Sequence, residues 1–364
     1  DPNADPVSAQ QANVTQDGTV VLTMGNRQEK VTTVTEQGIS SALVRLANPG
    51  QHVIYFLTGH GERDTQGSAN TGFSQAAATL QSKNYTIKTL SLINTQEVPA
   101  DASALVLAGP QQPLTQQEVQ RIQAYLDKGG SLVYLSAPAF SSSSTGTTTT
   151  PPASSSSDPL QTYLSQNWGI QLDNDVVIDP NVNQPLIAAS ASYGSHAVTQ
   201  GLSNIVTFYP SARSLTVGQA PQNVTVTPLV STASNTWGET DFASIQSGSP
   251  TYQAGTDKAG PLTIAAAATN SQTNARLVVA GDVDFGSDAL YSTYGDGDML
   301  INMVDWAARQ DQMISLTAKQ PVARSMRPPS SLTLNLTLLG TVVLLPGAFL
   351  AGGVSTWLTR RRRH

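Results

Sequence analysis

Residues 55–64 read YFLTGHGERD, a run of strand-forming residues that stops at two glycines bracketing a histidine. In an open α/β sheet, ligands collect beyond the carboxyl ends of the strands, so His60 and Glu62 would project over that edge. Gly59 and Gly61 permit backbone conformations that other residues avoid. Two interpretations stay open: a binding or catalytic cleft, or a tight turn whose backbone His60 and Glu62 hydrogen-bond. Gly109, in a second strand ending AGP, is predicted to share the rim.

A second group of carboxylates follows another apolar strand in GDVDFGSD, where Asp282 and Asp284 lie two residues apart. Carboxylates at this density suit Ca²⁺, but their spacing is not that of an EF-hand loop. Aspartate also caps turns and helices routinely. We therefore assign Asp282 and Asp284 to the candidate cleft and predict neither a metal nor another cofactor.

The segment NTWGET places Trp237 two residues before Glu239. An exposed tryptophan beside a carboxylate suits a sugar ring, whereas the alternative is a tryptophan packed under a long loop. A glycosidase needs two carboxylates across a cleft. Glu62 paired with Glu239 or Asp282 is the pairing that the sequence offers.

Composition excludes several classes of protein. The chain has 364 residues, a formal net charge of −6 and no cysteine, which rules out a cysteine nucleophile and hence amidotransferase chemistry. No Walker A motif is present, so the chain is not an ATPase. Only 12% of the residues are charged and no basic patch stands out, which argues against nucleic-acid binding.

The elements that must position these residues alternate between strand and helix, which indicates a mostly parallel sheet covered on both faces. An α/β ectodomain is predicted over 51–310, with a mobile Ser/Thr/Pro loop at 141–157 and a polar, β-rich insertion at 181–257. Thr115 and Glu118 form a capping-box pattern at the start of a helix. Residues 1–50 are predicted to form a hairpin around Gly25 and a helix, a remnant of an upstream segment.

The C-terminal part is predicted to anchor the chain in a membrane. Residues 332–359 contain a long uncharged stretch, preceded by a tether at 311–331 and followed by a basic tail at 360–364. A basic tail marks the cytoplasmic side, which places the ectodomain outside the cytoplasm of a single-pass protein of the cell membrane. The predicted anchor residues are Leu336, Pro346, Trp357, Arg360, Arg361, Arg362 and Arg363. Because the chain opens at DPNADP without an export signal, we expect a removed signal or a longer precursor.

An ordered series of motifs resembles the GldG-like family of membrane-anchored auxiliary proteins of bacterial ABC transport systems. The series comprises YFLTGHGERD, AGPQQPLTQQEVQRIQAYLDKGGSLVYL, NWGIQLDNDVVID, SHAVTQGL, NTWGET, RLVVAGDVDF and NMVDWAARQ. The resemblance implies a flavodoxin- or amidotransferase-like ectodomain, with an ABC permease and an ATPase as partners. It also connects the chain with gliding-motility machinery.

We therefore expect a non-enzymatic accessory subunit of an ABC-type transport or surface complex, with an ectodomain used for binding or assembly. Two alternatives remain. One is a cryptic hydrolase or lectin for surface carbohydrate that uses the TGHGE loop. The other is a structural surface subunit of a larger membrane complex.

Overall fold

The computed structural model describes residues 6–32, 34–47, 49–50, 52–67, 70–136, 158–314 and 339–361. The chain divides into two compact units, 1–319 and 320–364, which are described separately. The loop predicted at 141–157 and most of the predicted tether lie outside the described residues, as do 332–338 and 362–364 of the predicted anchor and tail.

The N-terminal segment forms the predicted hairpin and helix. After helix α1 (Pro6–Gln11), strands β1 (Val20–Met24) and β2 (Arg27–Val31) pair antiparallel, with Gly25 at φ 59° in the turn. Helix α2 (Glu36–Ala47) follows them, and its Arg45 Nε donates to Glu29 Oε2 at 2.9 Å. The hairpin turn and the helix that follows it were predicted from the sequence, whereas helix α1 was not.

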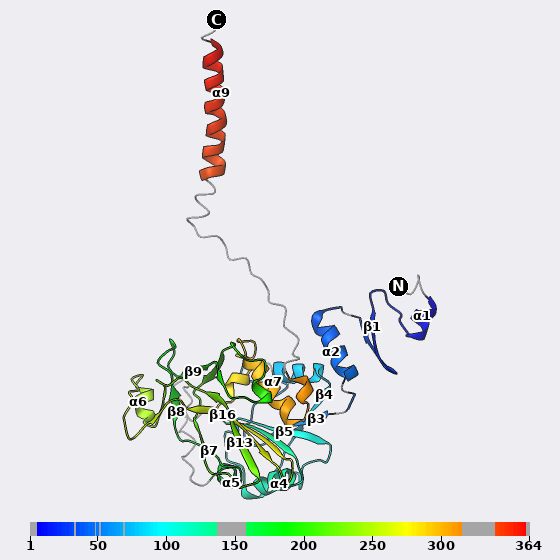
Figure 1. Ribbon diagram of the computed structural model, residues 1–364, viewed down its shortest axis with the longest axis vertical. Coiled ribbons are helices and arrows are strands. Elements are labelled where there is room, and N and C mark those ends of the chain that lie inside the picture. Colours follow the sequence, from blue (N-terminus) through cyan, green and yellow to red (C-terminus); the bar gives the residue numbers. More distant parts are fainter. Residues whose placement is uncertain are drawn as a thin grey trace. The chain divides into compact units, whose positions relative to one another are not determined.

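The main sheet is mixed, with a parallel half and an antiparallel half (Figure 1). Its parallel strands lie in the order β4-β3-β5-β6-β17, which is 2-1-3-4-5 when they are numbered along the chain. This is a doubly wound order whose direction reverses between β3 and β5. The bounds are β3 His52–Leu57, β4 Tyr85–Leu90, β5 Ala102–Ala108, β6 Ser131–Leu135 and β17 Arg276–Ala280.

Helices cover both faces of the parallel half. Ile54 and Phe56 of β3 pack in a cluster with α3 (Ser74–Ser82) and α7 (Asp296–Ala307). The alternating residues Tyr55 and Leu57 pack on the other face, with α4 (Gln116–Asp127) and α5 (Pro159–Trp168). Successive residues of β3 are thus buried on opposite faces, which explains the unbroken apolar run in its sequence.

The antiparallel half corrects the prediction of a mostly parallel sheet. Strand β16 (Thr263–Asn270) pairs antiparallel with β17, and β13 (Val224–Ser231) pairs antiparallel with β16. The sheet ends in β10 (Ser192–Tyr193), while β12 (Leu215–Val217) joins β16 to β7 (Ile170–Leu172). The residues between β6 and β17 thus extend the sheet as antiparallel strands.

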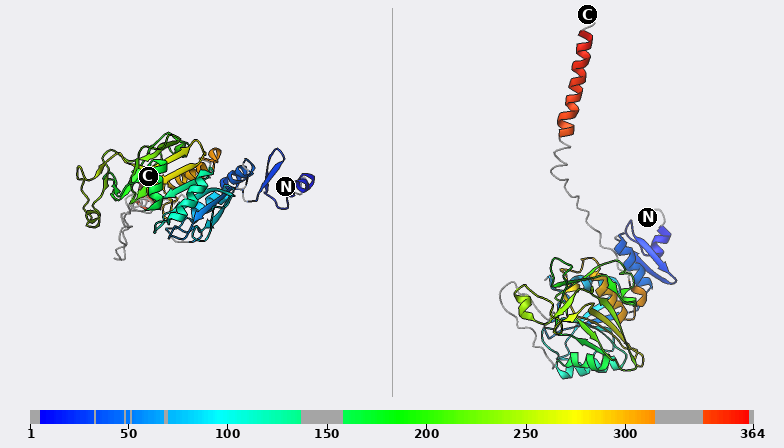
Figure 2. Two further views of the ribbon diagram at one scale, coloured as in Figure 1. Left: turned by 90° about the horizontal axis from the view of Figure 1, so that it is seen from below. Right: turned by 60° about the vertical axis from the view of Figure 1, so that its left-hand side comes forward.

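Two small sheets complete the β-rich segment. Strands β9 (Ile187–Ser190) and β11 (Thr207–Pro210) form one pair. The other sheet has the order β15-β14-β8. Its bounds are β8 Val176–Ile178, β14 Trp237–Glu239 and β15 Lys258–Ala259, and helix α6 spans Phe242–Gln246. Figures 1 and 2 show these green elements on the opposite side of the domain from β3 and β4.

The described C-terminal residues form a π-helical stretch, Leu339–Leu344, followed by α9 (Leu345–Arg361). None of the helices in the described parts of the chain is both long and apolar enough to cross a membrane. Helix α9 has 17 residues, with Pro346 near its start and arginine at its end. The prediction of one membrane-spanning helix over 332–359 is therefore not supported by the described residues.

Candidate functional site

The loop after β3 and the loop after β5 meet at the point where the strand order reverses. His60 O accepts hydrogen bonds from Gln111 N at 2.8 Å and Gln112 N at 3.1 Å. In return, Arg63 N donates to Ala108 O at 2.9 Å. The TGHGE segment and the AGP segment therefore form one continuous rim at the carboxyl edge of the sheet, as predicted.

Both glycines of TGHGE adopt a conformation that disfavours other residues. Gly59 has φ 127° and Gly61 has φ 80°. A Cβ at Gly59 would lie 2.8 Å from Ile93 Cδ1, and one at Gly61 would lie 3.0 Å from Gln111 Cβ. The rim thus needs glycine for its backbone angles and also for the side chains that lie over it.

His60 lies between two carboxylates. Its Nδ1 is 3.6 Å from Glu62 Oε1 and its Nε2 is 3.2 Å from Glu118 Oε2. Glu62 Oε2 also accepts His60 N at 2.7 Å, which is the local backbone bond expected of a turn. The contact with Glu118 was not predicted, because that residue belongs to α4. His60 therefore joins the β3 loop to the start of α4.

The Glu118 side chain contacts both His60 and Thr115. Its side chain forms the predicted capping box, in which Oε2 accepts Thr115 N at 2.9 Å and Thr115 Oγ1 at 2.7 Å. The residue is only 2% exposed, and its Oε1 has no hydrogen-bond partner among the described residues. The sequence analysis assigned Glu118 only a role as a helix cap, and no feature of the sequence indicated a contact with His60.

Asp282 and Asp284 lie in the loop after β17, on the same rim. Asp282 Oδ1 accepts Asp284 N at 2.8 Å and Oδ2 accepts Phe285 N at 3.0 Å. Burial first, and then the charge of Asp284, raises the pKa of Asp282 well above its usual value. Asp284 Oδ1 is 2.5 Å from Arg63 Nη2, which ties this loop to the one after β3.

Gly109 completes the rim, since a Cβ there would lie 2.8 Å from Val283 Cγ1. The structure thus brings together most of the predicted cleft residues. They are Gly59, His60, Gly61, Glu62, Gly109, Asp282 and Asp284.

Trp237 and Glu239 lie elsewhere, in strand β14 of the separate three-stranded sheet. Trp237 packs against the cluster of Val176, Ile178 and Ile245, and its Nε1 donates to Glu239 Oε2 at 3.2 Å. Glu239 Oε1 accepts Asp241 N at 2.9 Å. This geometry favours the packed tryptophan over the sugar platform. Glu62 follows a strand of the main sheet, whereas Glu239 lies in a strand of the three-stranded sheet.

A polar cluster that the sequence did not reveal joins this sheet to β12. Lys258 Nζ lies 2.5 Å from Asp173 Oδ2 and 2.8 Å from Thr216 Oγ1. Ser214 Oγ donates to Asp175 Oδ2 at 2.7 Å. Although serine and lysine meet here, Ser214 is fully buried and the lysine ammonium is paired with a carboxylate. The cluster therefore holds strands together and offers no accessible nucleophile.

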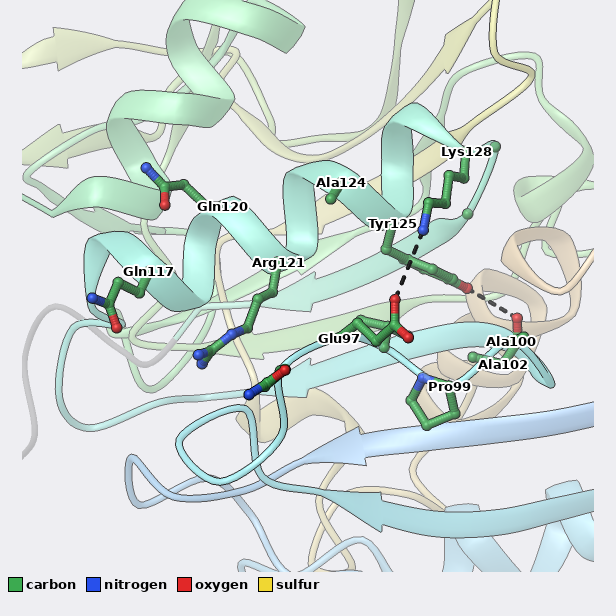
Figure 3. Close-up of a pocket in the computed structure, with 14 residues that line it drawn as sticks. Glu97, Pro99, Ala100, Ala102, Gln117, Gln120, Arg121, Ala124, Tyr125 and Lys128 are labelled. Carbon is green, nitrogen blue, oxygen red and sulfur yellow. Dashed lines mark hydrogen bonds and ion pairs between the residues drawn. The ribbon is translucent and has the colours of Figure 1, made fainter.

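A groove of about 940 Å³ lies at the other edge of the sheet, where β5 and β6 begin (Figure 3). Tyr125 lies within it and donates its hydroxyl to Ala102 O at 3.2 Å, while Lys128 and Glu97 face each other at 3.9 Å. Arg121 donates to Leu92 O. The groove lies between helix α4 and loop 96–100, away from the predicted rim.

No cluster of three metal-ligating side chains occurs within the described ranges. At the rim, both oxygens of Asp282 already accept backbone N–H groups. The candidate site is therefore a rim of glycines and buried carboxylates that are engaged with the protein's own backbone.

The fold and the rim define an α/β domain whose parallel strands have a doubly wound order. The chain belongs to the ABC_transp_aux family, described as an ABC-type uncharacterized transport system, whose family model matches residues 51–303. Among curated proteins there is no significant match.

Solved structures that are similar to this chain at low sequence identity include the following proteins. The mmIFT52 N-terminal domain is 18% identical with a TM-score of 0.49, over 70% of this chain and 97% of that one. A thua-like protein from Bacteroides uniformis ATCC 8492 is 15% identical, with a TM-score of 0.38 over 74% of this chain and 96% of that one. Exo-beta-1,4-mannosidase Op5Man5 from Opitutaceae bacterium strain TAV5 is 11% identical, with a TM-score of 0.32 over 78% of this chain and 38% of that one.

Proposed function

We propose that this chain is a non-enzymatic accessory subunit of an ABC-type transport complex of the GldG-like kind. Its α/β domain would bind or assemble with the permease and ATPase subunits. The observation that carries the proposal is the family match over 51–303, which spans the parallel sheet and the rim. The strand order 2-1-3-4-5 supports a flavodoxin-like description of this domain.

The state of the rim supports a binding role over a catalytic one. A general acid or base must reach a substrate proton. Here Glu62 accepts a hydrogen bond from His60 N, and Asp282 accepts hydrogen bonds from two backbone N–H groups. Glu118 caps helix α4. Each of these carboxylates is thus already bonded within the protein. These carboxylates order three loops of one edge, which suits a surface that recognises a partner.

The positions at which the chain enters and leaves the domain support the same proposal. His52 starts β3 at the amino-terminal edge of the sheet, and Gln310 follows α7 at that edge, with Gln310 Nε2 3.4 Å from His52 Nδ1. The rim lies at the opposite, carboxyl-terminal edge. Attachments made through either end of the domain therefore leave the rim accessible to a partner.

Membrane anchoring through 332–359, with the tail in the cytoplasm and the domain outside, is part of the proposal. The support is the uncharged stretch of sequence followed by arginines. Protease added to intact cells should digest the domain and leave the tail intact. A domain that remains protected in intact cells and becomes sensitive only after lysis would contradict this orientation.

Purification from native membranes in mild detergent tests the central claim. A permease and an ATPase should copurify with the chain at fixed stoichiometry and dissociate when the rim is altered by Gly61→Arg. A matched change at the exposed turn glycine, Gly248→Arg, should leave the complex intact, since a Cβ there meets nothing within 4 Å. Turnover of chromogenic glycosides that is abolished by Glu62→Gln would instead favour a hydrolase.

A further inference from the structure

His196 lies at the point where a loop of the β-rich segment meets helix α7. It caps the short helix η1 (Ala197–Thr199), because its Nδ1 accepts a hydrogen bond from Val198 N at 3.2 Å. Its ring packs edge-on against the indole of Trp306, with centroids 4.8 Å apart and planes at 68°. Trp306 belongs to the last turn of α7, so one side chain both orders the loop and holds it to the helix.

The hydrogen bond at Nδ1 requires a neutral imidazole. The neutral ring has one nitrogen that accepts, whereas the protonated ring donates from both nitrogens. The ring that caps η1 must therefore carry its proton on Nε2. Protonation of Nδ1 would set two N–H donors against each other, so the bond from Val198 N would be lost.

A second cation already lies on the same indole. The guanidinium carbon of Arg276 is 4.8 Å from the centroid of the Trp306 ring, and Arg276 Nη1 donates to Trp306 O at 2.6 Å. The guanidinium also donates two hydrogen bonds to the carboxylate of Asp311, in the short helix η3 (Asp311–Met313), at 2.6 and 3.1 Å. A positive charge on His196 would thus be repelled by Arg276 from β17, while Asp311 would attract it.

The repulsion and the burial outweigh the attraction. Burial first, and then the charge of Arg276, lowers the pKa of His196 from its ordinary value of 6.5, against the opposing effect of Asp311. Because the folded state has the lower pKa, the contribution of His196 to stability is fully present above about pH 6.5 and is lost as the pH falls below it. Asp305, the other charged residue near the end of α7, is paired with Lys83.

We propose that His196 is a pH-sensitive switch that releases loop 194–206 from helix α7 when the surroundings become acidic. The neutral ring caps η1 beside Trp306, whereas the charged ring loses the cap and lies close to a second cation. Loss of the cap also loosens Val198, whose carbonyl accepts a hydrogen bond from Asn302 Nδ2 of α7 at 3.0 Å. The inference goes beyond the proposed function and is independent of it, since it concerns contacts within the domain.

Hydrogen exchange of the purified full chain tests the switch. The amides of loop 194–206 are compared at pH 7.5 and pH 5.5, after correction for the intrinsic effect of pH on exchange. In wild type their protection should fall by roughly three- to tenfold at the lower pH, which corresponds to the loss of one hydrogen bond. His196→Asn keeps an oxygen acceptor for Val198 N but does not titrate, so its protection should be equal at both pH values.

Two results would overturn the proposal. One is a wild-type loop that keeps its protection at pH 5.5, and the other is an equal fall in wild type and in His196→Asn. If His196→Asn is already unprotected at pH 7.5, His196→Ser replaces it, because serine is also a capping residue without a charge. The same two results then decide.

His52 provides a matched control. Burial lowers its pKa as well, but its ring contacts Tyr85 and not Trp306. His52→Asn should therefore show the same acid-dependent loss of protection in loop 194–206 as wild type. If His52→Asn abolishes that loss as completely as His196→Asn, acid acts on the domain as a whole, and the role given to His196 is wrong.

Discussion

Lys83 and Asp305, which are 222 residues apart in the chain, form an ion pair buried in the domain. The lysine ammonium is 2.5 Å from Asp305 Oδ2 and donates to Met313 O at 2.7 Å, while Tyr85 Oη donates to Asp305 Oδ1 at 2.8 Å. These bonds connect the end of α3, the start of β4, helix α7 and the segment that follows it. The pair therefore closes the amino-terminal edge of the sheet.

Removal of one partner of this pair should be severely destabilising. Lys83→Met leaves the Asp305 carboxylate buried without its cation, and we expect a loss of about 3–5 kcal/mol in the free energy of unfolding. Urea denaturation followed by circular dichroism measures it. The exposed pair of Lys88 and Asp101 is the control, and Lys88→Met should leave the midpoint almost unchanged. Similar losses in both variants would contradict this account.

Asp296 should make the domain less stable as the pH rises. Burial raises the pKa of its carboxyl to about 8, compared with 3.8 in an unfolded chain. Between these values the folded state holds a proton that the unfolded state has released, so the contribution of Asp296 to stability is greatest below pH 4 and declines toward pH 8, by at most about 1.4 kcal/mol per pH unit. Asp282 shifts in the same direction.

Asp296→Asn removes this titration while it keeps an acceptor for Phe208 N. The unfolding free energy of the variant, measured by urea denaturation from pH 5 to pH 9, should decline less steeply than that of wild type. The variant should be the more stable protein at pH 9. Parallel pH profiles would show that Asp296 titrates alike in the folded and unfolded chains.

Gly61→Ala should destabilise the domain more than Gly248→Ala. The two glycines have similar angles, φ 80° and φ 73°, so the conformational cost of about 1–2 kcal/mol is shared. Only at Gly61 does the added Cβ meet a neighbour, the Gln111 side chain at 3.0 Å. Thermal unfolding of both variants should reveal the difference. Equal midpoints would mean that Gln111 moves aside freely.

His60→Ala should cost about 2 kcal/mol, because it removes the partner of a buried carboxylate in another element. This exceeds what a residue bonded only to its own loop would contribute. Glu62→Gln retains an oxygen acceptor for His60 N and should be nearly neutral. Unfolding free energies of the two variants test the difference, and a neutral His60→Ala would show that the contact with Glu118 contributes nothing.

Chelation should leave the melting temperature unchanged, since the oxygens of Asp282 already bind backbone N–H groups. The measurement is differential scanning calorimetry before and after dialysis against EDTA. A fall that Ca²⁺ restores would establish a cation site at the rim.

The elements with strong local signals could be predicted from the sequence. The apolar run before Gly59 predicted β3, and Thr115 with Glu118 predicted the start of α4 within one residue. The need for glycine at 59 and 61 was also evident, because a strand that turns abruptly requires such angles. These features depend on residues within a few positions of each other.

Features that depend on distant pairing could not be predicted. Strand β13 exposes Thr225 and Pro228, and its register is set by pairing with distant strands such as β16, with Val224 opposite Asn270. The same limit applies to the site, where the His60 side chain meets Glu118 across two elements. The capping pattern with Thr115 already explained why a glutamate stands at position 118. Nothing else in the sequence indicated its contact with His60.

The proximity of His52 and Gln310 has a consequence for how the domain could be rearranged. The start of β3 and the residues after α7 lie side by side. A short linker between these two points would therefore join the ends of the domain's chain without distorting the sheet. The chain could then be opened at another exposed turn, such as the one at Gly248. Such a circular permutant should fold, and would present its cut ends beside the small three-stranded sheet.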